Sequence, residues 1–204
     1  MRPLVKICGL TRAEDARAAV HCGATHIGCV MVEDSPRCVN ADVAKEVFDV
    51  VEPDTVRVLV FKNERPEKIL ATAGSASTKH VQVYGLEEDE TLRLEQEGMT
   101  VFRVVGIDPT ARSLPSLSPV PSAKRPAVLD VRGGGSGQRF SWGLLGAHAP
   151  TGTFIAGGVC PENISELMEH RPFGVDLSSG VEIAPGIKDP RRLQLFFENL
   201  EKSL

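Results

Sequence analysis

The sequence lacks a long apolar run. No stretch approaches the roughly 18 residues that a membrane-spanning helix needs. It also does not begin with a positively charged segment followed by an apolar core, which is the pattern of a secretory signal peptide. We therefore expect a cytoplasmic protein that has no membrane partner.

The sequence also lacks paired metal or disulfide ligands. Its cysteines are odd in number, irregularly spaced and include no CxxC pair, which argues against a disulfide framework and a structural zinc site. The cysteines are Cys8, Cys22, Cys29, Cys38 and Cys160. The histidines are scattered without ligand spacing, at His21, His26, His80, His148 and His170. These patterns indicate a reducing compartment and no metal site.

An excess of positive charge is absent as well. The chain has 23 lysines and arginines against 27 aspartates and glutamates, a net charge of −4. Without a basic stripe, nucleic acid is not an expected partner. The 204 residues suit one domain with a substantial core, and no linker interrupts them, so we predict a single domain over residues 1–204.

Strand-like and helix-like segments alternate along the chain. Thr11 with Glu14 three residues later has the pattern of a capping box and predicts a helix that Gly23 ends. The predicted strands are residues 5–8, 25–31, 55–61, 81–85, 100–105, 127–131, 153–158 and 174–180. Further helices are predicted at 42–51, 65–73, 88–96, 141–145, 161–170 and 190–200.

Eight strands that alternate with helices in this length are typical of a single-domain (β/α)8 TIM barrel, an α/β fold. Residues 108–125 contain four prolines and several serines, so we expect an irregular crossover after the fifth strand with at most one short helix. A doubly wound open sheet is the alternative, because alternation alone does not say whether the sheet closes.

Active sites of such barrels lie at the carboxyl ends of the strands. Cys8 ends the first strand, just before a glycine that lets a ligand approach closely. Asp130 lies in an otherwise apolar strand, where a carboxylate is costly unless it is paired or protonated. Both are candidate catalytic residues. The alternatives are a buried packing role for Cys8 and an ion pair with Arg132 for Asp130.

Small residues follow the last two strands. Gly157 and Gly158 follow the seventh strand, and Ser178, Ser179 and Gly180 follow the eighth. Their accessible backbone N–H groups would lie where barrels commonly hold a phosphate, since a larger side chain would keep the phosphate oxygens away. Taken singly, these residues would be read as turn glycines and a serine cap. Occurring together after these two strands, they predict a phosphate site.

These residues belong to a set of motifs that resembles the phosphoribosylanthranilate isomerase family of tryptophan biosynthesis over nearly the whole chain. The motifs, in the family's order, are 5–11, 35–37, 81–82, 129–130, 134–137, 156–158, 161–163 and 175–182. The resemblance implies a (β/α)8 isomerase. It would convert N-(5-phosphoribosyl)anthranilate to 1-(2-carboxyphenylamino)-1-deoxyribulose 5-phosphate by an Amadori rearrangement, without metal or organic cofactor.

The resemblance also implies roles for single residues. Cys8 matches the family's general base, Asp130 its general acid, and Arg37 the residue that meets the anthranilate carboxylate. The phosphate would bind at Gly157, Gly158, Ser179 and Gly180, with help from Gly135 and Gly137. The partner is then a small phosphoribosyl compound, and the protein is a monomer or a homodimer.

Two other functions stay open. One is a related barrel that acts on another phosphoribosyl compound, such as the bifunctional isomerase that also serves histidine biosynthesis; Cys8 stands where that enzyme has an aspartate. The other is a barrel that binds a phosphoribosyl ligand without converting it, although both Cys8 and Asp130 are present.

The chain also departs from the family pattern. The loop after Asp130 is short, and Tyr84 stands where a histidine is usual. The remaining departures are Gln138, Ser141, Cys29 and Met31.

Overall fold

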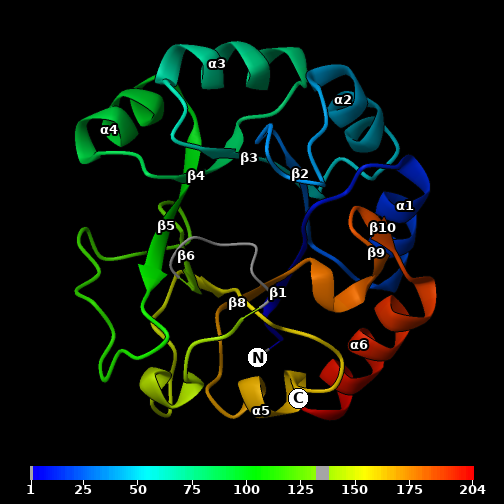
Figure 1. Ribbon diagram of the computed structural model, residues 1–204, viewed down its shortest axis with the longest axis vertical. Helices are drawn as coiled ribbons and strands as arrows, with labels where there is room; N and C mark the ends of the chain where they lie inside the picture. The colour runs from blue at the N-terminus through cyan, green and yellow to red at the C-terminus, as the bar shows by residue number, and fades with distance from the viewer. Residues whose placement is uncertain (1, 132–137) are drawn as a thin grey trace.

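Eight parallel strands form a closed barrel in the order in which they follow along the chain (Figure 1). The computed structural model describes residues 2–131 and 138–204. The barrel strands are β1 Leu4–Ile7, β2 His26–Val30, β3 Val56–Lys62, β4 His80–Tyr84, β5 Thr100–Ile107, β6 Ala127–Val131, β7 Thr153–Ile155 and β8 Gly174–Leu177. Because β1 pairs with both β2 and β8, the sheet has no open edge. The predicted barrel is therefore confirmed, and the open sheet is excluded.

Helices surround the barrel as an outer ring (Figure 1). They are α1 Ala13–Cys22, α2 Ala41–Asp49, α3 Pro66–Ser75, α4 Glu88–Gln96, α5 Ile164–Met168 and α6 Pro190–Lys202, with 3₁₀ helices η1 Trp142–Leu145 and η2 Ser179–Val181. A short antiparallel hairpin of β9 Glu182–Ala184 and β10 Ile187–Lys188 follows η2. This hairpin was not among the predicted elements.

The predicted capping box at the start of α1 is wrong. The N-cap residue is Arg12, which makes no side-chain capping bond. The Thr11 hydroxyl instead donates to the carbonyl oxygen of Gly186 in the β9–β10 hairpin, at 2.6 Å. The Thr11 hydroxyl, which the local pattern assigned to capping α1, is thus used in a tertiary hydrogen bond. The predicted stop at Gly23 is correct, because Gly23 has φ 116° and its N–H bonds back to the last turn.

The crossover after β5 is irregular, as predicted, and holds no helix between residues 108 and 125. Arg103 on β5 fastens this segment by donating to the carbonyl oxygens of Ser118 at 2.9 Å and Pro119 at 2.7 Å. These bonds satisfy backbone acceptors that a helix would otherwise have satisfied.

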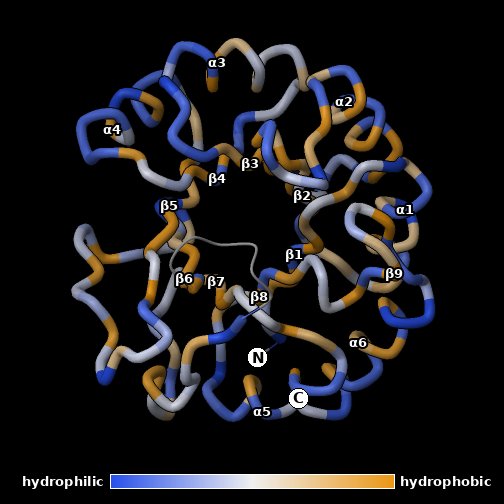
Figure 2. Tube along the Cα trace, viewed as in Figure 1, coloured by the Kyte–Doolittle hydropathy of each residue, from blue (hydrophilic) through white to orange (hydrophobic). Residues whose placement is uncertain are grey.

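Apolar side chains form two cores, one on each side of the barrel wall. Between the wall and the helices lies the larger core, which includes Val5 and Ile7 of β1 and Phe196 of α6. Figure 2 shows hydrophobic residues along the strands and hydrophilic residues on the outer turns of the helices. Inside the barrel lies a smaller apolar cluster that includes Phe102 and Phe154.

The barrel interior changes from apolar to polar along its axis, because alternate residues of each strand point inward. At the amino end, His26 makes edge contacts with Phe102 and Phe154, at ring-centroid separations of 5.9 and 5.1 Å. Nearer the carboxyl end, Lys6 and Asp176 are both buried and form an ion pair. This polar layer is the floor of the cavity described below.

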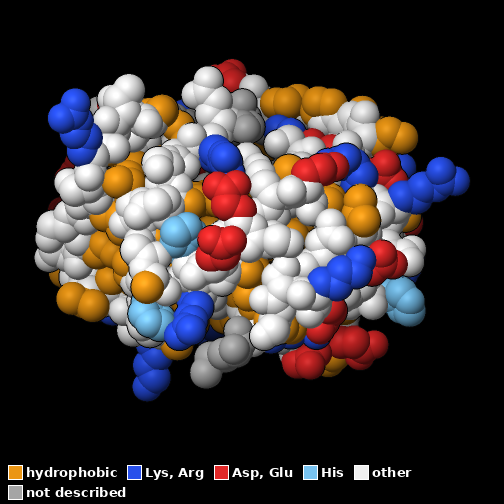
Figure 3. All heavy atoms as spheres, turned by 90° about the horizontal axis from the view of Figure 1, so that it is seen from below, with side chains coloured by type: hydrophobic (Ala, Val, Ile, Leu, Met, Phe, Trp, Pro, Cys, Tyr) orange, Lys and Arg blue, Asp and Glu red, His pale blue; other side chains and the backbone are white. Residues whose placement is uncertain are grey.

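Acidic, basic and apolar side chains are interspersed on the face seen in Figure 3, so this face is neither mainly acidic nor mainly basic. Across the residues that the structure describes, no helix has the length and apolar character to span a membrane.

Candidate active site

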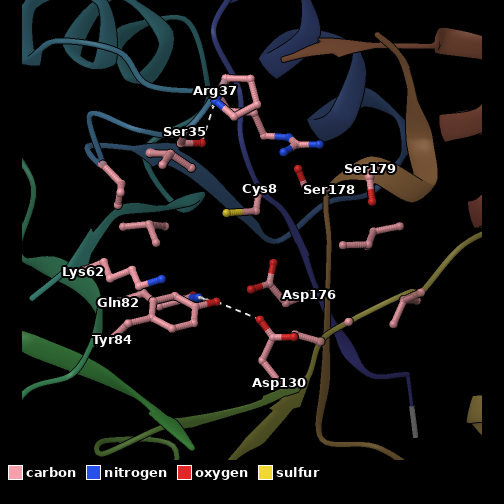
Figure 4. Close-up of a pocket in the computed structure, with 18 of the residues that line it drawn as sticks. Cys8, Ser35, Arg37, Lys62, Gln82, Tyr84, Asp130, Asp176, Ser178 and Ser179 are labelled. Carbon is pink, nitrogen blue, oxygen red and sulfur yellow. Dashed lines mark hydrogen bonds between the residues drawn. The ribbon is translucent and has the colours of Figure 1, made fainter. Parts of the chain in front are cut away.

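A cavity of about 330 Å³ opens at the carboxyl ends of the strands. It brings together side chains from the ends of β1, β3, β4, β6 and β8 with the loops after β2 and β7 (Figure 4). Its lining includes Cys8, Ser35, Arg37, Lys62, Gln82, Tyr84, Asp130, Gly157, Gly158, Asp176, Ser178 and Ser179. The site therefore lies where the barrel prediction located it.

Cys8 lies on the β1 side of the cavity and is 8 % exposed. Gly28 on the neighbouring strand makes room for it, since a Cβ added at Gly28 would lie 2.9 Å from the Cys8 sulfur. Burial raises the pKa of the Cys8 thiol, the Lys6 ammonium opposes this, and the Asp176 carboxylate adds to it. The thiol is thus held mostly protonated, with a cation beneath it that favours the thiolate.

Asp130 is the last residue but one of β6 and is 5 % exposed. Its Oδ2 accepts a hydrogen bond from the Tyr84 hydroxyl at 2.8 Å, and its Oδ1 accepts one from the Val131 N–H at 2.8 Å. Burial raises the pKa of Asp130, the Tyr84 hydrogen bond lowers it, and the charge of Asp176 raises it. The net upward shift favours a carboxyl group that can act as an acid. Arg132, the alternative ion-pair partner, lies outside the described residues.

A chain of hydrogen bonds connects two carboxylates along the floor of the cavity. Lys6 Nζ donates to Asp176 Oδ2 at 2.8 Å and to Gln82 Oε1 at 2.9 Å. Gln82 Nε2 in turn donates to the Tyr84 hydroxyl at 3.4 Å, and Tyr84 donates to Asp130. Burial lowers the pKa of Lys6, but Asp176 and Cys8 outweigh it and the net shift is upward. Lys6 is therefore held as a buried cation.

Arg37 is held by a carboxylate of the β9–β10 hairpin. Its Nε and Nη2 donate to the two oxygens of Glu182, at 2.9 and 2.6 Å. The buried Lys188 also donates to Glu182, at 2.7 Å. In the described part of the chain, Arg37 Nη1 makes no hydrogen bond to protein. Glu182 thus orients the residue that the resemblance assigned to the anthranilate carboxylate, and the two N–H groups of Nη1 are left for a ligand.

Three of the predicted phosphate residues lie at one side of the cavity. Gly157, Gly158 and Ser179 line it, whereas Gly180 does not. Gly180 packs against the backbone of Val159. Gly157 has φ 83°, and an added Cβ would lie 2.9 Å from Asp130 Oδ1, so both the turn and the approach to Asp130 require glycine there. Gly135 and Gly137 lie outside the described residues.

Several polar residues of the site were not predicted from the sequence. They are Lys6, Gln82, Tyr84, Asp176, Glu182 and Lys188. The available signal was a polar side chain at an alternate position of a strand, as at Lys6 two residues before Cys8. That signal becomes specific only once the barrel closes and shows which face points inward.

Comparison with known proteins gives one consistent result. The family model described as "N-(5'phosphoribosyl)anthranilate (PRA) isomerase" matches residues 5–199. The N-(5'-phosphoribosyl)anthranilate isomerase of Thermotoga maritima is 36 % identical over 201 residues, covering 96 % of this chain and 97 % of that protein.

Solved structures agree with this result. The crystal structure of the phosphoribosyl anthranilate isomerase from Thermus thermophilus matches with a TM-score of 0.82 and 32 % identity, over 98 % of both chains. An isomerase structure in complex with reduced 1-(o-carboxyphenylamino)-1-deoxyribulose 5-phosphate matches with a TM-score of 0.79 and 32 % identity, over 98 % of this chain and 99 % of that one.

Proposed function

The chain belongs to the N-(5′-phosphoribosyl)anthranilate isomerase family, and from this premise we propose that Cys8 is the general base and Asp130 the general acid of its reaction. The protein is an isomerase of tryptophan biosynthesis. It catalyses the Amadori rearrangement of N-(5′-phosphoribosyl)anthranilate to 1-(2-carboxyphenylamino)-1-deoxyribulose 5-phosphate. The observation that carries the residue assignment is that a buried thiol and a buried carboxyl group face one cavity from β1 and β6.

The first step requires an acid. Asp130 gives its proton to the ring oxygen of the ribose, the bond from that oxygen to C1′ breaks, and the nitrogen lone pair forms a C1′=N bond. The upward shift of the Asp130 pKa supports this role, because it enlarges the protonated fraction of the carboxyl group at any given pH.

The second step requires a base. The Cys8 thiolate takes the proton from C2′, the electron pair of that C–H bond forms a C1′=C2′ bond, and the C=N electrons return to nitrogen. Transfer of the enol proton to C1′ then gives the ketone. Lys6 supports the base, since its charge lowers the pKa of Cys8 against the effect of burial.

The phosphate and the anthranilate carboxylate of the substrate would bind at different parts of the cavity. Gly157, Gly158 and Ser179, which line the cavity on the β7 and β8 side, are proposed to bind the phosphate. The resemblance adds Gly180, Gly135 and Gly137 to this proposed phosphate site. At the other end, Nη1 of Arg37 is proposed to bind the anthranilate carboxylate, with Glu182 holding the guanidinium in place.

The test is the loss of phosphoribosylanthranilate fluorescence with purified protein under metal-free conditions. Cys8→Ser and Asp130→Asn should each lower kcat by about 10²- to 10⁴-fold, the usual contribution of one acid or base. Cys38→Ser and Asp49→Asn, which change an exposed thiol and a surface carboxylate, are the controls and should leave the rate unchanged.

Full activity in either site variant would refute the assigned role. A wild-type chain that binds the reduced product analogue but leaves the fluorescence unchanged would support the alternative of a barrel that binds without converting.

A further inference from the structure

One carboxylate of the cavity has an oxygen that the protein does not use. Asp176 is 6 % exposed, and its Oδ1 is buried with no hydrogen-bond partner among the described residues. Its Oδ2 is occupied by Lys6 at 2.8 Å. Leaving a buried carboxylate oxygen unpaired is costly, so such a group points to a partner that arrives with the ligand.

The position of Asp176 shows which part of the ligand its free oxygen would contact. Asp176 lines the cavity, and Figure 4 shows it between Cys8 and Asp130. The strand register explains this placement. Asp176 on β8 pairs with Lys6 on β1, and Lys6 is the inward-facing residue that precedes Cys8. The charge of Asp176 also raises the pKa of both Cys8 and Asp130, as expected of a carboxylate close to both.

The chemistry then identifies the atoms opposite Asp176. This step rests on the proposed roles of Cys8 at C2′ and Asp130 at the ring oxygen. Both atoms are bonded to C1′, which also carries the nitrogen. A group located between the base and the acid therefore faces C1′ and its nitrogen.

We propose that Asp176 is a third catalytic residue, whose free oxygen accepts a hydrogen bond from the substrate N–H and whose charge stabilises the cationic C1′=N intermediate. When the ring opens, the nitrogen lone pair becomes the C1′=N bond and the nitrogen becomes positively charged. When Cys8 removes the C2′ proton, that charge disappears again. Asp176 transfers no proton, and its interaction is strongest at the charged stage, which is the condition for lowering the barrier.

Two other roles fit the arrangement less well. Asp176 would repel a phosphate, and the glycines proposed for the phosphate lie on another part of the wall. A role limited to holding Lys6 would need only the one oxygen that Lys6 already occupies. Neither role uses the unpaired Oδ1.

The test compares turnover with binding. Asp176→Asn keeps the size of the side chain and an acceptor for Lys6 but removes the charge. Its kcat should fall by about 100-fold, as for the loss of one electrostatic contact to a transition state. The dissociation constant of the reduced product analogue should stay nearly unchanged, because the nitrogen of that ligand is a neutral amine. Both are measured at the pH optimum of each variant, so that shifted titration of Cys8 or Asp130 does not enter the comparison.

Two further variants keep the test decisive. Gln82→Met removes the other acceptor of Lys6 and leaves Asp176 intact, and it should cost much less kcat than Asp176→Asn. If Asp176→Asn does not unfold cooperatively, Asp176→Glu retains the charge beside Lys6 and displaces the carboxylate; it should bind the analogue and turn over slowly.

Four results would overturn the proposal. The kcat of Asp176→Asn could be unchanged, or Asp176→Asn could raise KM and the dissociation constant of the analogue at constant kcat, which would assign Asp176 to a ribose hydroxyl. The other two are a loss of kcat in Gln82→Met equal to that in Asp176→Asn and a wild-type kcat in Asp176→Glu. An inactive wild-type chain would instead refute the proposed function itself, which separates the two failures.

Discussion

Tyr84 connects the proposed acid to the buried polar layer. Its hydroxyl donates to Asp130 and accepts from Gln82. Burial raises the pKa of Tyr84 well above its ordinary value, and the charge of Asp130 adds to the shift, so the hydroxyl keeps its proton. As a donor to the carboxylate form, it lowers the pKa of Asp130 against the effect of burial. Tyr84 is therefore a positioning residue that also sets when the acid titrates.

The replacement Tyr84→Phe removes only that hydroxyl, and the pKa of Asp130 should rise. The reactive enzyme form has Asp130 protonated and Cys8 as thiolate. Because the pKa of Cys8 lies above that of Asp130, the fraction of this form is constant between the two values and falls below the pKa of Asp130. The acid limb of kcat/KM against pH should therefore move to higher pH in Tyr84→Phe. Superimposable profiles would show that Tyr84 does not control Asp130.

At the residue scale, sequence reasoning identified Cys8 and Asp130 because both stand at or near a strand end in apolar surroundings. It did not identify Lys6, Gln82 or Asp176. Whether a polar residue inside a strand faces the barrel axis or the helices depends on strand register and closure, which are set by contacts far apart in the sequence.

The β9–β10 hairpin holds the loop that carries Arg37. Glu182 at its start binds Arg37 through both carboxylate oxygens and also accepts from the buried Lys188. Burial raises the pKa of Glu182, but Arg37 and Lys188 outweigh it and the net shift is downward. The hairpin thus carries the counter-charge for two cations beside the cavity.

Glu182→Gln should lower the free energy of unfolding by about 3 kcal/mol, because it leaves a buried cation without its carboxylate. It should also raise KM, since Arg37 loses its fixed orientation. Urea denaturation and steady-state kinetics measure the two effects. Glu67→Gln, at the exposed pair with Arg93, is the control and should leave both nearly unchanged. Equal stability of the Glu182 variant and the wild type would contradict this role of the hairpin.

At the element scale, the strands and most helices were predictable from local patterns, whereas the hairpin and the start of α1 were not. The strands combine β-branched runs with turn residues at their ends, and these signals act over a few residues. The Thr11 hydroxyl, by contrast, is bound by Gly186 from a distant part of the chain. A local capping pattern contains no information about such a distant hydrogen-bond partner. A two-residue strand such as β10 is too short to show a periodic pattern in the sequence.

At the scale of the whole molecule, the barrel separates stability from chemistry along its axis. Its amino end is filled by aromatic rings around His26, its middle carries the Lys6–Asp176 pair, and its carboxyl end opens into the cavity. Among the described residues no carboxylate pairs with the His26 ring, whose Nδ1 contacts only the Thr25 hydroxyl, at 2.8 Å. Burial there, together with the charge of Lys6, lowers the pKa of His26 from 6.5 to about 3.

This shift makes the stability of the barrel depend on pH. Between about pH 6.5 and pH 3 the unfolded chain binds a proton at His26 that the folded chain excludes, so stability is present above this window and is lost as the pH falls through it. From pH 7 to pH 5 the loss through His26 should be about 2 kcal/mol in the free energy of unfolding. Urea denaturation at both values measures it. In His26→Leu, which keeps an apolar contact to Phe102 and Phe154, this part of the pH dependence should disappear. If the two proteins lose equal stability over the same interval, the buried ring does not exclude the proton and the acid sensitivity arises elsewhere in the barrel.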